Sequence, residues 1–190
     1  MSNRILLIID PQIDFITGSL AVPGAEKAMN KLAEYIKQKG NLYKKIIVTA
    51  DYHPIDHISF EVNGGKWPSH CIADSVGAAI WPSVMDSFLP YAHKIKILHK
   101  GDKTNQEEYS IFKNEESAQK LQNIINQEEI DTIDICGLAG DICVADTIND
   151  GLSLIENVKF NVLKEFTPSL DGGIVLNSII EKQNLSCNLL

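Results

Sequence analysis

Apolar positions along the chain gather in short runs that are rich in β-branched residues. Within each run the apolar side chains are nearly continuous, which is typical of strands buried on both faces of a parallel sheet. The predicted strands cover residues 5–9, 45–49, 95–98, 132–136 and 158–163. Parallel strands need long crossover connections, so helices are expected between them.

Helical patterns do occupy the stretches between these runs. The predicted helices cover residues 25–39, 116–126, 142–154 and 173–182. Gly40 follows the first of them, at a position where glycine commonly ends a helix. Strands that alternate with helices predict an α/β fold, namely a doubly wound, mostly parallel sheet with helices on both faces. We expect one domain over residues 1–190.

Residues 51–90 form a long stretch with little periodicity that contains Gly64, Gly65 and several prolines. A long irregular segment inside a compact domain is usually functional when it is ordered. In doubly wound sheets the ligand binds at the carboxyl ends of the strands. Because this stretch starts at such an end, we expect it to carry a metal and substrate site.

Composition and charge narrow the class of protein. The chain has 190 residues, of which 44% are hydrophobic and 22% charged, as in ordinary globular proteins. Its net charge of −8, with no offsetting stripe of lysine and arginine, disfavours nucleic acid and anionic membranes as partners. A small uncharged substrate fits better. No apolar run has the length of a membrane span or of a secretion signal, so we expect a cytoplasmic protein.

Reactive side chains follow the predicted strands where the fold would place a site. Asp10 comes directly after the first run, and Asp51 and His53 come after the second. Lys100 follows the third run, and a glycine-containing turn that leads to Cys143 follows the fourth. The sequence therefore predicts that these side chains meet at one edge of the sheet.

A cluster of histidines and one aspartate predicts a metal site. His53 and His57 are four residues apart, Asp51 precedes them, and His70 follows in the motif WPSH. Two imidazoles and a carboxylate are a common protein contribution to a catalytic metal site and suit zinc, iron or manganese. The alternative is a set of exposed loop histidines, which is the commoner situation for any single histidine. His93 and His99 lack such company and are interpreted as structural or exposed.

Cys143 is the candidate nucleophile. The four cysteines show no CxxC spacing, so free thiols are expected. Cys143 lies at the start of a predicted helix, where backbone amides lower a thiol pKa and can bind an oxyanion. Attack on an amide also needs a proton acceptor and a cation, for which Asp10 and Lys100 are available. The alternative is a core cysteine, which is the interpretation that suits Cys136 and Cys187.

Several ordered motifs resemble the isochorismatase-like cysteine hydrolases, and within that family the nicotinamidase branch. The resemblance spans residues 5 to about 150 and rests on LLIIDPQIDF, TADYHPIDHISF, WPSHC, LHKG and GLAGDICV. It implies a catalytic triad of Asp10, Lys100 and Cys143. The implied reaction hydrolyses nicotinamide to nicotinate and ammonia through a cysteine thioester, in NAD salvage, with pyrazinamide as a surrogate substrate.

The resemblance also implies ligands and substrate contacts. One divalent metal ion (zinc, iron or manganese) would be held by Asp51, His53 and His70, with His57 as a nearby or variable ligand. Phe15 and Trp67 would sandwich the substrate ring, although both could equally be core aromatics. The N–H groups of Ala139 and Cys143 would form the oxyanion hole, beside a cis peptide between Leu138 and Ala139. Family members often form homo-oligomers, so self-association of this chain is expected too.

The sequence departs from the family pattern at two places, and two alternative functions are considered. Relatives carry a different pattern where this chain has ADSVGA, and they carry threonine where it has Gly140. These departures concern loop detail and substrate range. One rival is a relative that acts on another small amide or on an enol ether, a branch marked by loss of the metal ligands. The other is a non-enzymatic metal-binding or scaffolding protein with an unreactive, buried Cys143.

Overall fold

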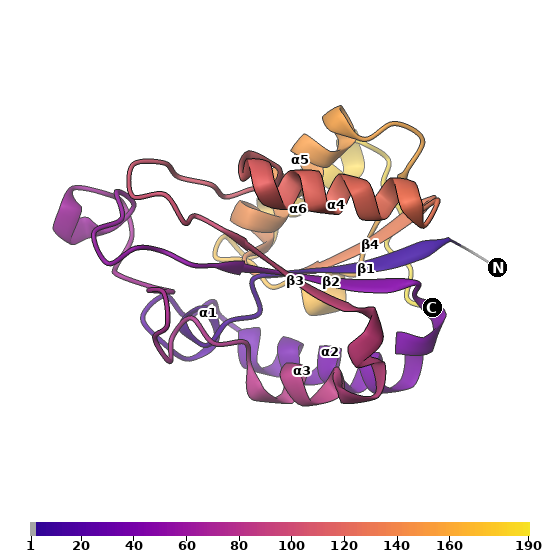
Figure 1. Cartoon of the computed structure of the whole chain (residues 1–190), viewed down its shortest axis with the longest axis horizontal. Coiled ribbons are helices and arrows are strands. Elements are labelled where there is room, and N and C mark those ends of the chain that lie inside the picture. The colour runs from indigo at the N-terminus through magenta and orange to yellow at the C-terminus, as the bar shows by residue number, and fades with distance from the viewer. Residues whose placement is uncertain (1–2) are drawn as a thin grey trace.

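Five parallel strands form one sheet in the order β3-β2-β1-β4-β5 (Figure 1). A computed structural model describes residues 3–190; residues 1 and 2, which belong to the predicted domain, lie outside the described residues. The strands are β1 (Arg4–Ile9), β2 (Lys45–Asp51), β3 (Ile95–Lys100), β4 (Thr132–Gly137) and β5 (Lys159–Val162). The predicted α/β class with a doubly wound parallel sheet is confirmed.

Helices cover both faces of the sheet (Figure 1). One face carries α1 (Ile13–Ile16), α2 (Ala25–Lys39) and α3 (Pro82–Ser87), and the other carries α4 (Glu115–Gln127), α5 (Ala145–Leu154) and α6 (Ile174–Lys182). Side chains of a strand alternate between the two faces. In β1, Leu6 and Ile8 pack into the core under α2, whereas Ile5, Leu7 and Ile9 pack under α4 and α5. This two-sided burial is the reason why the strand sequences are continuously apolar.

The end of α2 differs from the predicted glycine cap in its physical cause. Gly40 is the residue that ends the helix, but its φ is −58° and the chain continues into a 3-10 turn over Gly40–Leu42. Glycine is needed here for space, because a Cβ atom on Gly40 would lie 2.5 Å from the ring of Tyr91. The residue therefore lets the segment before β3 pack against the end of α2.

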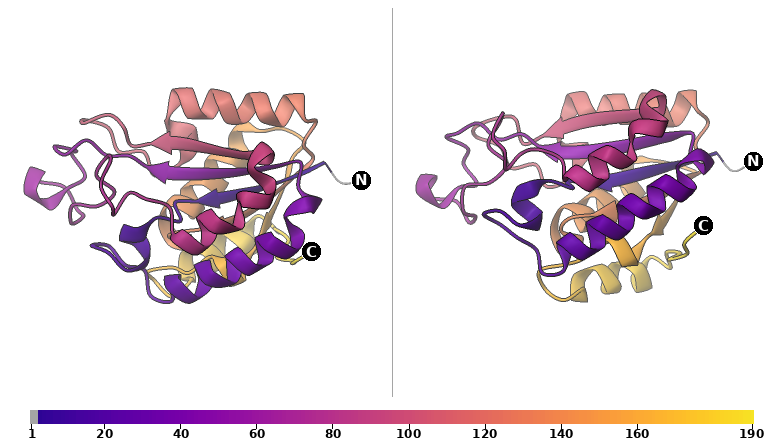
Figure 2. Two further views of the ribbon diagram at one scale, coloured as in Figure 1. Left: turned by 60° about the horizontal axis from the view of Figure 1, so that its bottom comes forward. Right: turned by 90° about the horizontal axis from the view of Figure 1, so that it is seen from below.

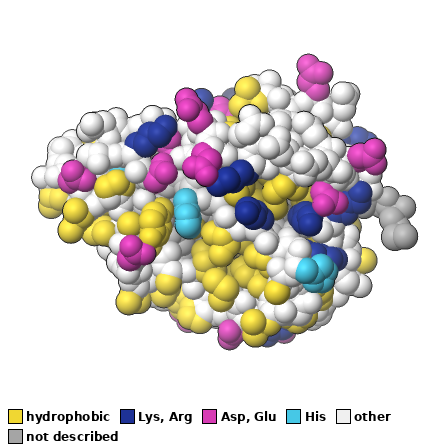
Figure 3. All heavy atoms as spheres, in the orientation of Figure 1, with side chains coloured by type: hydrophobic (Ala, Val, Ile, Leu, Met, Phe, Trp, Pro, Cys, Tyr) yellow, Lys and Arg dark blue, Asp and Glu magenta, His cyan; other side chains and the backbone are white. Residues whose placement is uncertain are grey.

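The strand β3 was predicted to be buried on both faces, and this prediction is wrong. It forms an edge of the sheet, and the side chain of Ile97 is 37% exposed. Figure 3 shows this side of the molecule, on which hydrophobic side chains lie beside lysine and arginine side chains. A run of apolar residues indicates that a strand forms, but not whether that strand lies at the centre or at the edge of the sheet.

Several element boundaries also differ from the predictions. The strands β2 and β3 each extend two residues beyond the predicted ends, so Asp51 and Lys100 are the last residues of their strands. The helix predicted from residue 142 starts with a π-helical turn over Gly140–Val144, and regular α5 follows. The stretch 51–90 contains α3, which has six residues and is too short to show a helical period.

The carboxyl ends of the strands point to one end of the molecule, away from the two chain termini (Figures 1 and 2). The irregular segments 52–66 and 101–110 extend from that end. Within residues 3–190, no helix is both long and apolar enough to cross a membrane.

Candidate active site

Three adjacent strands and one turn supply the polar residues of the site. Asp10 directly follows β1, while Asp51 and Lys100 are register partners at the ends of β2 and β3. Cys143 comes from the turn after β4. Asp10 has a left-handed backbone conformation with φ 46°, which is uncommon for a residue other than glycine and frequent at functional sites. The structure thus brings together the side chains that the sequence predicted to meet.

Lys100 is the centre of this group. Its side chain is fully buried (0% exposed), and its Nζ lies 2.8 Å from Asp10 Oδ2 and 2.5 Å from Asp51 Oδ1. The same Nζ lies 3.6 Å from Cys143 Sγ. Burial opposes the charge of Lys100, but the two carboxylates hold its pKa well above the usual value. Lys100 is therefore a fixed cation between two acids and a thiol.

The thiol itself is in a less ionising environment than the sequence predicted. Burial raises the pKa of Cys143 well above its usual value, and the nearby charge of Lys100 opposes this shift. The predicted lowering of this pKa is wrong for the resting site, because desolvation outweighs the stabilising groups. Ionisation of the Cys143 thiol would therefore need a nearby base.

Asp10 can act as that base. Burial raises its pKa to about 6, with Lys100 opposing the rise, so most of this carboxyl is ionised at neutral pH. Asp10, Asp51 and Cys143 each place an oxygen or sulfur atom within 4.8 Å of the others. Burial raises the pKa of Asp51, but Lys100 and His53 together lower it by more, so the net pKa is below its usual value. Asp51 is therefore ionised at neutral pH.

A second group of side chains has the composition of a metal site. Ligand atoms of Asp51, His53 and His70 all lie within 4.8 Å of one another, and the three residues are buried. His53 Nδ1 lies 2.8 Å from the carbonyl oxygen of Gly101, and His70 Nδ1 lies 2.7 Å from that of Pro68. A carbonyl only accepts, so each Nδ1 carries a proton, and in the neutral imidazole Nε2 is then the nitrogen available to a ligand; His53 Nε2 lies 3.6 Å from Asp51 Oδ2. Such carbonyl-oriented imidazoles with a carboxylate fit a divalent metal ion.

His57 lies behind this group rather than within it. Its ring stacks on that of His53 with centroids 4.1 Å apart. Its Nδ1 lies 2.6 Å from Ser59 Oγ and its Nε2 lies 3.0 Å from the carbonyl oxygen of Gln106. Both nitrogens thus have partners within the protein. We therefore propose a supporting position for His57 in place of the variable ligand that the sequence suggested.

A narrow pocket joins the thiol to the metal-type group. Its free volume in this structure is about 30 Å³, so it is a tight cleft and not an open cavity. The lining residues are Phe15, Leu20, Val22, Asp51, Trp67, His70, Glu107, Tyr109, Ala139, Ile142, Cys143 and Leu170. Phe15 and Trp67, the predicted substrate contacts, both line the pocket, and Phe15 also belongs to the buried core. A larger, open hollow lies along α2 and contains none of the predicted site residues.

Several pocket residues were missed by the sequence analysis. Glu107 and Tyr109 lie in the segment between β3 and α4, which has no period that would reveal which side chains face inward. Tyr109 accepts a hydrogen bond from the indole N–H of Trp67 at 3.0 Å. Leu170 lies far away in sequence and is held by Asp141, whose Oδ1 accepts its backbone N–H at 2.9 Å. These contacts depend on chain segments that only the fold brings together.

Gln12, in the motif LLIIDPQIDF, makes specific contacts that the sequence did not reveal. Its side chain is fully buried and bonds both main-chain groups of Asp51: Nε2 donates to the carbonyl, and Oε1 accepts from the N–H, each at 2.8 Å. Nε2 also donates to the carbonyl of Ala78 at 2.9 Å. Gln12 thereby connects the end of β2 to the segment 71–80.

The turn that carries Cys143 contains the cis peptide between Leu138 and Ala139 that the resemblance implied. A side chain at Gly140 would have no room, because its Cβ would lie 2.3 Å from Ser169 Oγ. The Ser169 side chain thus fills the space beside this turn. Glycine therefore fits closely at this turn, and a larger residue would require Ser169 to move.

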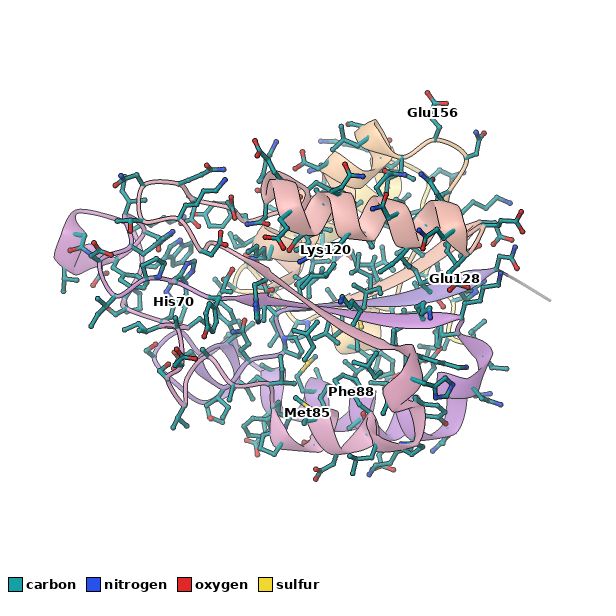
Figure 4. The ribbon with its side chains drawn as sticks, in the orientation of Figure 1. His70, Met85, Phe88, Lys120, Glu128 and Glu156 are labelled. Carbon is teal, nitrogen blue, oxygen red and sulfur yellow. The ribbon has the colours of Figure 1, made fainter. Side chains whose placement is uncertain are left out.

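Figure 4 places His70 beyond the carboxyl ends of the strands, at the end of the molecule from which the irregular segments extend.

Residues 4–154 match the family model of the isochorismatase domain. A nicotinamidase of Escherichia coli is 31% identical over 186 residues, covering 87% of this chain and 83% of that relative. A nicotinamidase of Saccharomyces cerevisiae is 29% identical over 208 residues and covers 94% of each chain.

Solved structures show the same similarity. The pyrazinamidase of Pyrococcus horikoshii in complex with zinc superposes with a TM-score of 0.81 at 26% identity, covering 99% of each chain. The yeast nicotinamidase bound to the inhibitor nicotinaldehyde superposes with a TM-score of 0.81, also at 26% identity, over 97% of this chain and 98% of that one. The chain belongs to the isochorismatase family, which confirms the family predicted from its motifs. Within that family, its similarity is to nicotinamidases and pyrazinamidases.

Proposed function

We propose that this protein is a metal-dependent amidohydrolase that converts nicotinamide to nicotinate and ammonia, and that it also accepts pyrazinamide. The observation that carries the proposal is the junction of two groups in one pocket. Cys143, Asp51 and His70 all line this pocket, and Lys100 lies behind it in contact with Cys143 and Asp10. Relatives in sequence and structure that are themselves nicotinamidases support it. The product would enter NAD salvage.

The proposed chemistry starts with the protonated thiol. Asp10 accepts the proton of Cys143 while Sγ forms a bond to the carboxamide carbon of the substrate. The N–H groups of Ala139 and Cys143 are the proposed donors to the oxyanion. The carbon–nitrogen bond then breaks, and Asp10 returns the proton so that ammonia leaves. This leaves a thioester, which water hydrolyses to nicotinate and the free thiol.

Lys100 has an electrostatic role in this scheme. Its Nζ contacts both carboxylates and lies within 3.6 Å of Sγ, so it offsets the negative charge that forms on the sulfur. The pocket is mostly apolar away from these groups, so this charge pair acts with little screening by water. The mechanism therefore needs no thiolate in the resting enzyme.

Asp51, His53 and His70 would hold the divalent metal ion. When bound, this ion supplies a Lewis acid that can anchor the ring nitrogen of the substrate. Phe15 and Trp67 would position the ring from the pocket walls, and offset stacking of this kind contributes roughly 0.5–1.5 kcal/mol beyond burial. The proton transfer, the nucleophilic attack and the charge stabilisation are assigned to Asp10, Cys143 and Lys100.

Ammonia release decides between the proposed function and its rivals. Purified protein with bound zinc, iron or manganese is expected to release ammonia from nicotinamide and pyrazinamide, measured by a coupled assay. Turnover of isochorismate with no release from nicotinamide would instead assign the protein to the enol-ether branch. Metal binding without turnover of any of the three compounds would support the scaffolding alternative.

His53→Ala is expected to lower zinc content to near zero and to raise KM for nicotinamide. The reason is that the variant removes one of three converging ligands. Zinc content is measured by elemental analysis after gel filtration. His99→Ala is the matched control, because His99 lies on β3 with an exposed side chain outside the group. Full zinc content in the His53 variant would contradict the assignment.

A further inference from the structure

The segment after β3 orients both histidines that follow β2. The carbonyl of Gly101 accepts from His53 Nδ1 at 2.8 Å, and the carbonyl of Gln106 lies 3.0 Å from His57 Nε2. The two rings stack on each other. The direction of His53 Nε2 toward Asp51 and His70 therefore depends on the position of this segment.

Glu108 is the group that fixes the segment from within. Its side chain is 0% exposed, and its Oε2 accepts the backbone N–H of Gly101 at 2.7 Å and Asn114 Nδ2 at 3.0 Å. Its Oε1 accepts Gln106 Nε2 at 3.0 Å. A buried carboxylate is costly unless it is hydrogen-bonded, and here amide donors alone satisfy it. Glu108 thus joins the two residues whose carbonyls contact the histidines.

Gly101 packs closely against His53, with no space for a side chain. Its φ is +67°, which only glycine adopts readily, and a Cβ atom there would lie 2.4 Å from His53 Cε1. The backbone of Gly101 therefore lies directly against the His53 ring. A shift of Gly101 would be passed on to that ring, because its carbonyl is the partner of Nδ1.

We propose that Glu108 is a positioning residue for the metal ligand His53. By holding the N–H of Gly101, it keeps the Gly101 carbonyl in place to accept Nδ1–H, and this fixes Nε2 toward Asp51 and His70. The proposal rests on the proposed function insofar as that function assigns a metal to this group. Substitution of such outer partners typically weakens metal binding about 10–100-fold.

The test compares zinc affinity among three variants, measured by competition with a chromophoric chelator. Glu108→Ala is expected to raise the zinc dissociation constant by about tenfold, the lower end of the range for such partners. Glu108→Gln is expected to restore it, because one side-chain oxygen can still accept from Gly101. Asp102→Ala is the matched control: Asp102 Oδ1 accepts from the same Asn114 Nδ2 at 2.9 Å, whereas the N–H of Gly101 is bound by Glu108.

Thermal unfolding of the metal-free proteins separates positioning from mere stability. A lower unfolding temperature for Glu108→Ala with an unchanged zinc dissociation constant would overturn the proposal, as would an equal loss of affinity in Asp102→Ala. If Glu108→Ala does not fold, Glu108→Asp takes its place. The shorter acid is expected to weaken zinc binding while glutamine of the original length does not, and the reverse order would overturn the proposal.

The same measurements keep this inference apart from the proposed function. Wild-type protein that binds no zinc and releases no ammonia from nicotinamide would refute the proposed function. Wild-type protein that does both, with zinc affinity unaffected by Glu108→Ala, would refute only the role of Glu108.

Discussion

Cys143→Ala is expected to abolish ammonia release from nicotinamide while zinc remains bound. Loss of a covalent nucleophile typically lowers kcat by about 10⁴-fold or more. The metal should stay, because Cys143 does not belong to the group of Asp51, His53 and His70. Turnover is measured by the coupled ammonia assay, and zinc content by elemental analysis of the same sample.

Two further observations make this result specific to the thiol. Cys187→Ala is the matched control, because Cys187 is a free cysteine near the end of the chain that is exposed, so its interpretation as a core cysteine is wrong. It is expected to retain full activity. Iodoacetamide should inactivate the wild type, and nicotinamide should slow this inactivation by occupying the pocket. Activity retained in Cys143→Ala would refute the thioester mechanism, and inertness of Cys143 to alkylation would favour the scaffolding alternative.

Lys100→Met is expected to have the second large effect, on both stability and turnover. The substitution keeps the length of the side chain but leaves Asp10 and Asp51 buried without their cation. Breaking a buried ion pair in this way typically costs roughly 3–5 kcal/mol of unfolding free energy. Ammonia release should also fall below detection, because nothing then offsets the charge that develops on Cys143.

Urea unfolding, in the presence and absence of zinc, measures the first effect. Lys45→Met is the matched control: its Nζ lies 3.4 Å from Glu128 Oε1, and both side chains are about one-third exposed. Such surface pairs contribute about 0–1 kcal/mol. Equal destabilisation by the two substitutions would show that Lys100 does not carry the buried charge balance described above.

Much of the architecture could be read from local patterns. The apolar runs at residues 5–9, 45–49 and 132–136 correspond to β1, β2 and β4, which are the central strands. Their continuous apolar character has a direct cause, since both faces of the sheet are covered by helices. Because ligands bind at the carboxyl ends of such strands, the positions of Asp10 and Asp51 in the site followed from the same pattern.

By itself, then, the sequence determined the fold class, the family and the candidate site residues, because strand and helix periods and short motifs are local properties. Only the tertiary structure decided how those side chains act on one another. It placed Lys100 between two acids, made β3 an edge, and raised the pKa of Cys143 instead of lowering it. It also joined Glu108 to Gly101 and so to His53. Burial and distances between side chains depend on which segments the fold packs together, and local patterns do not encode that packing.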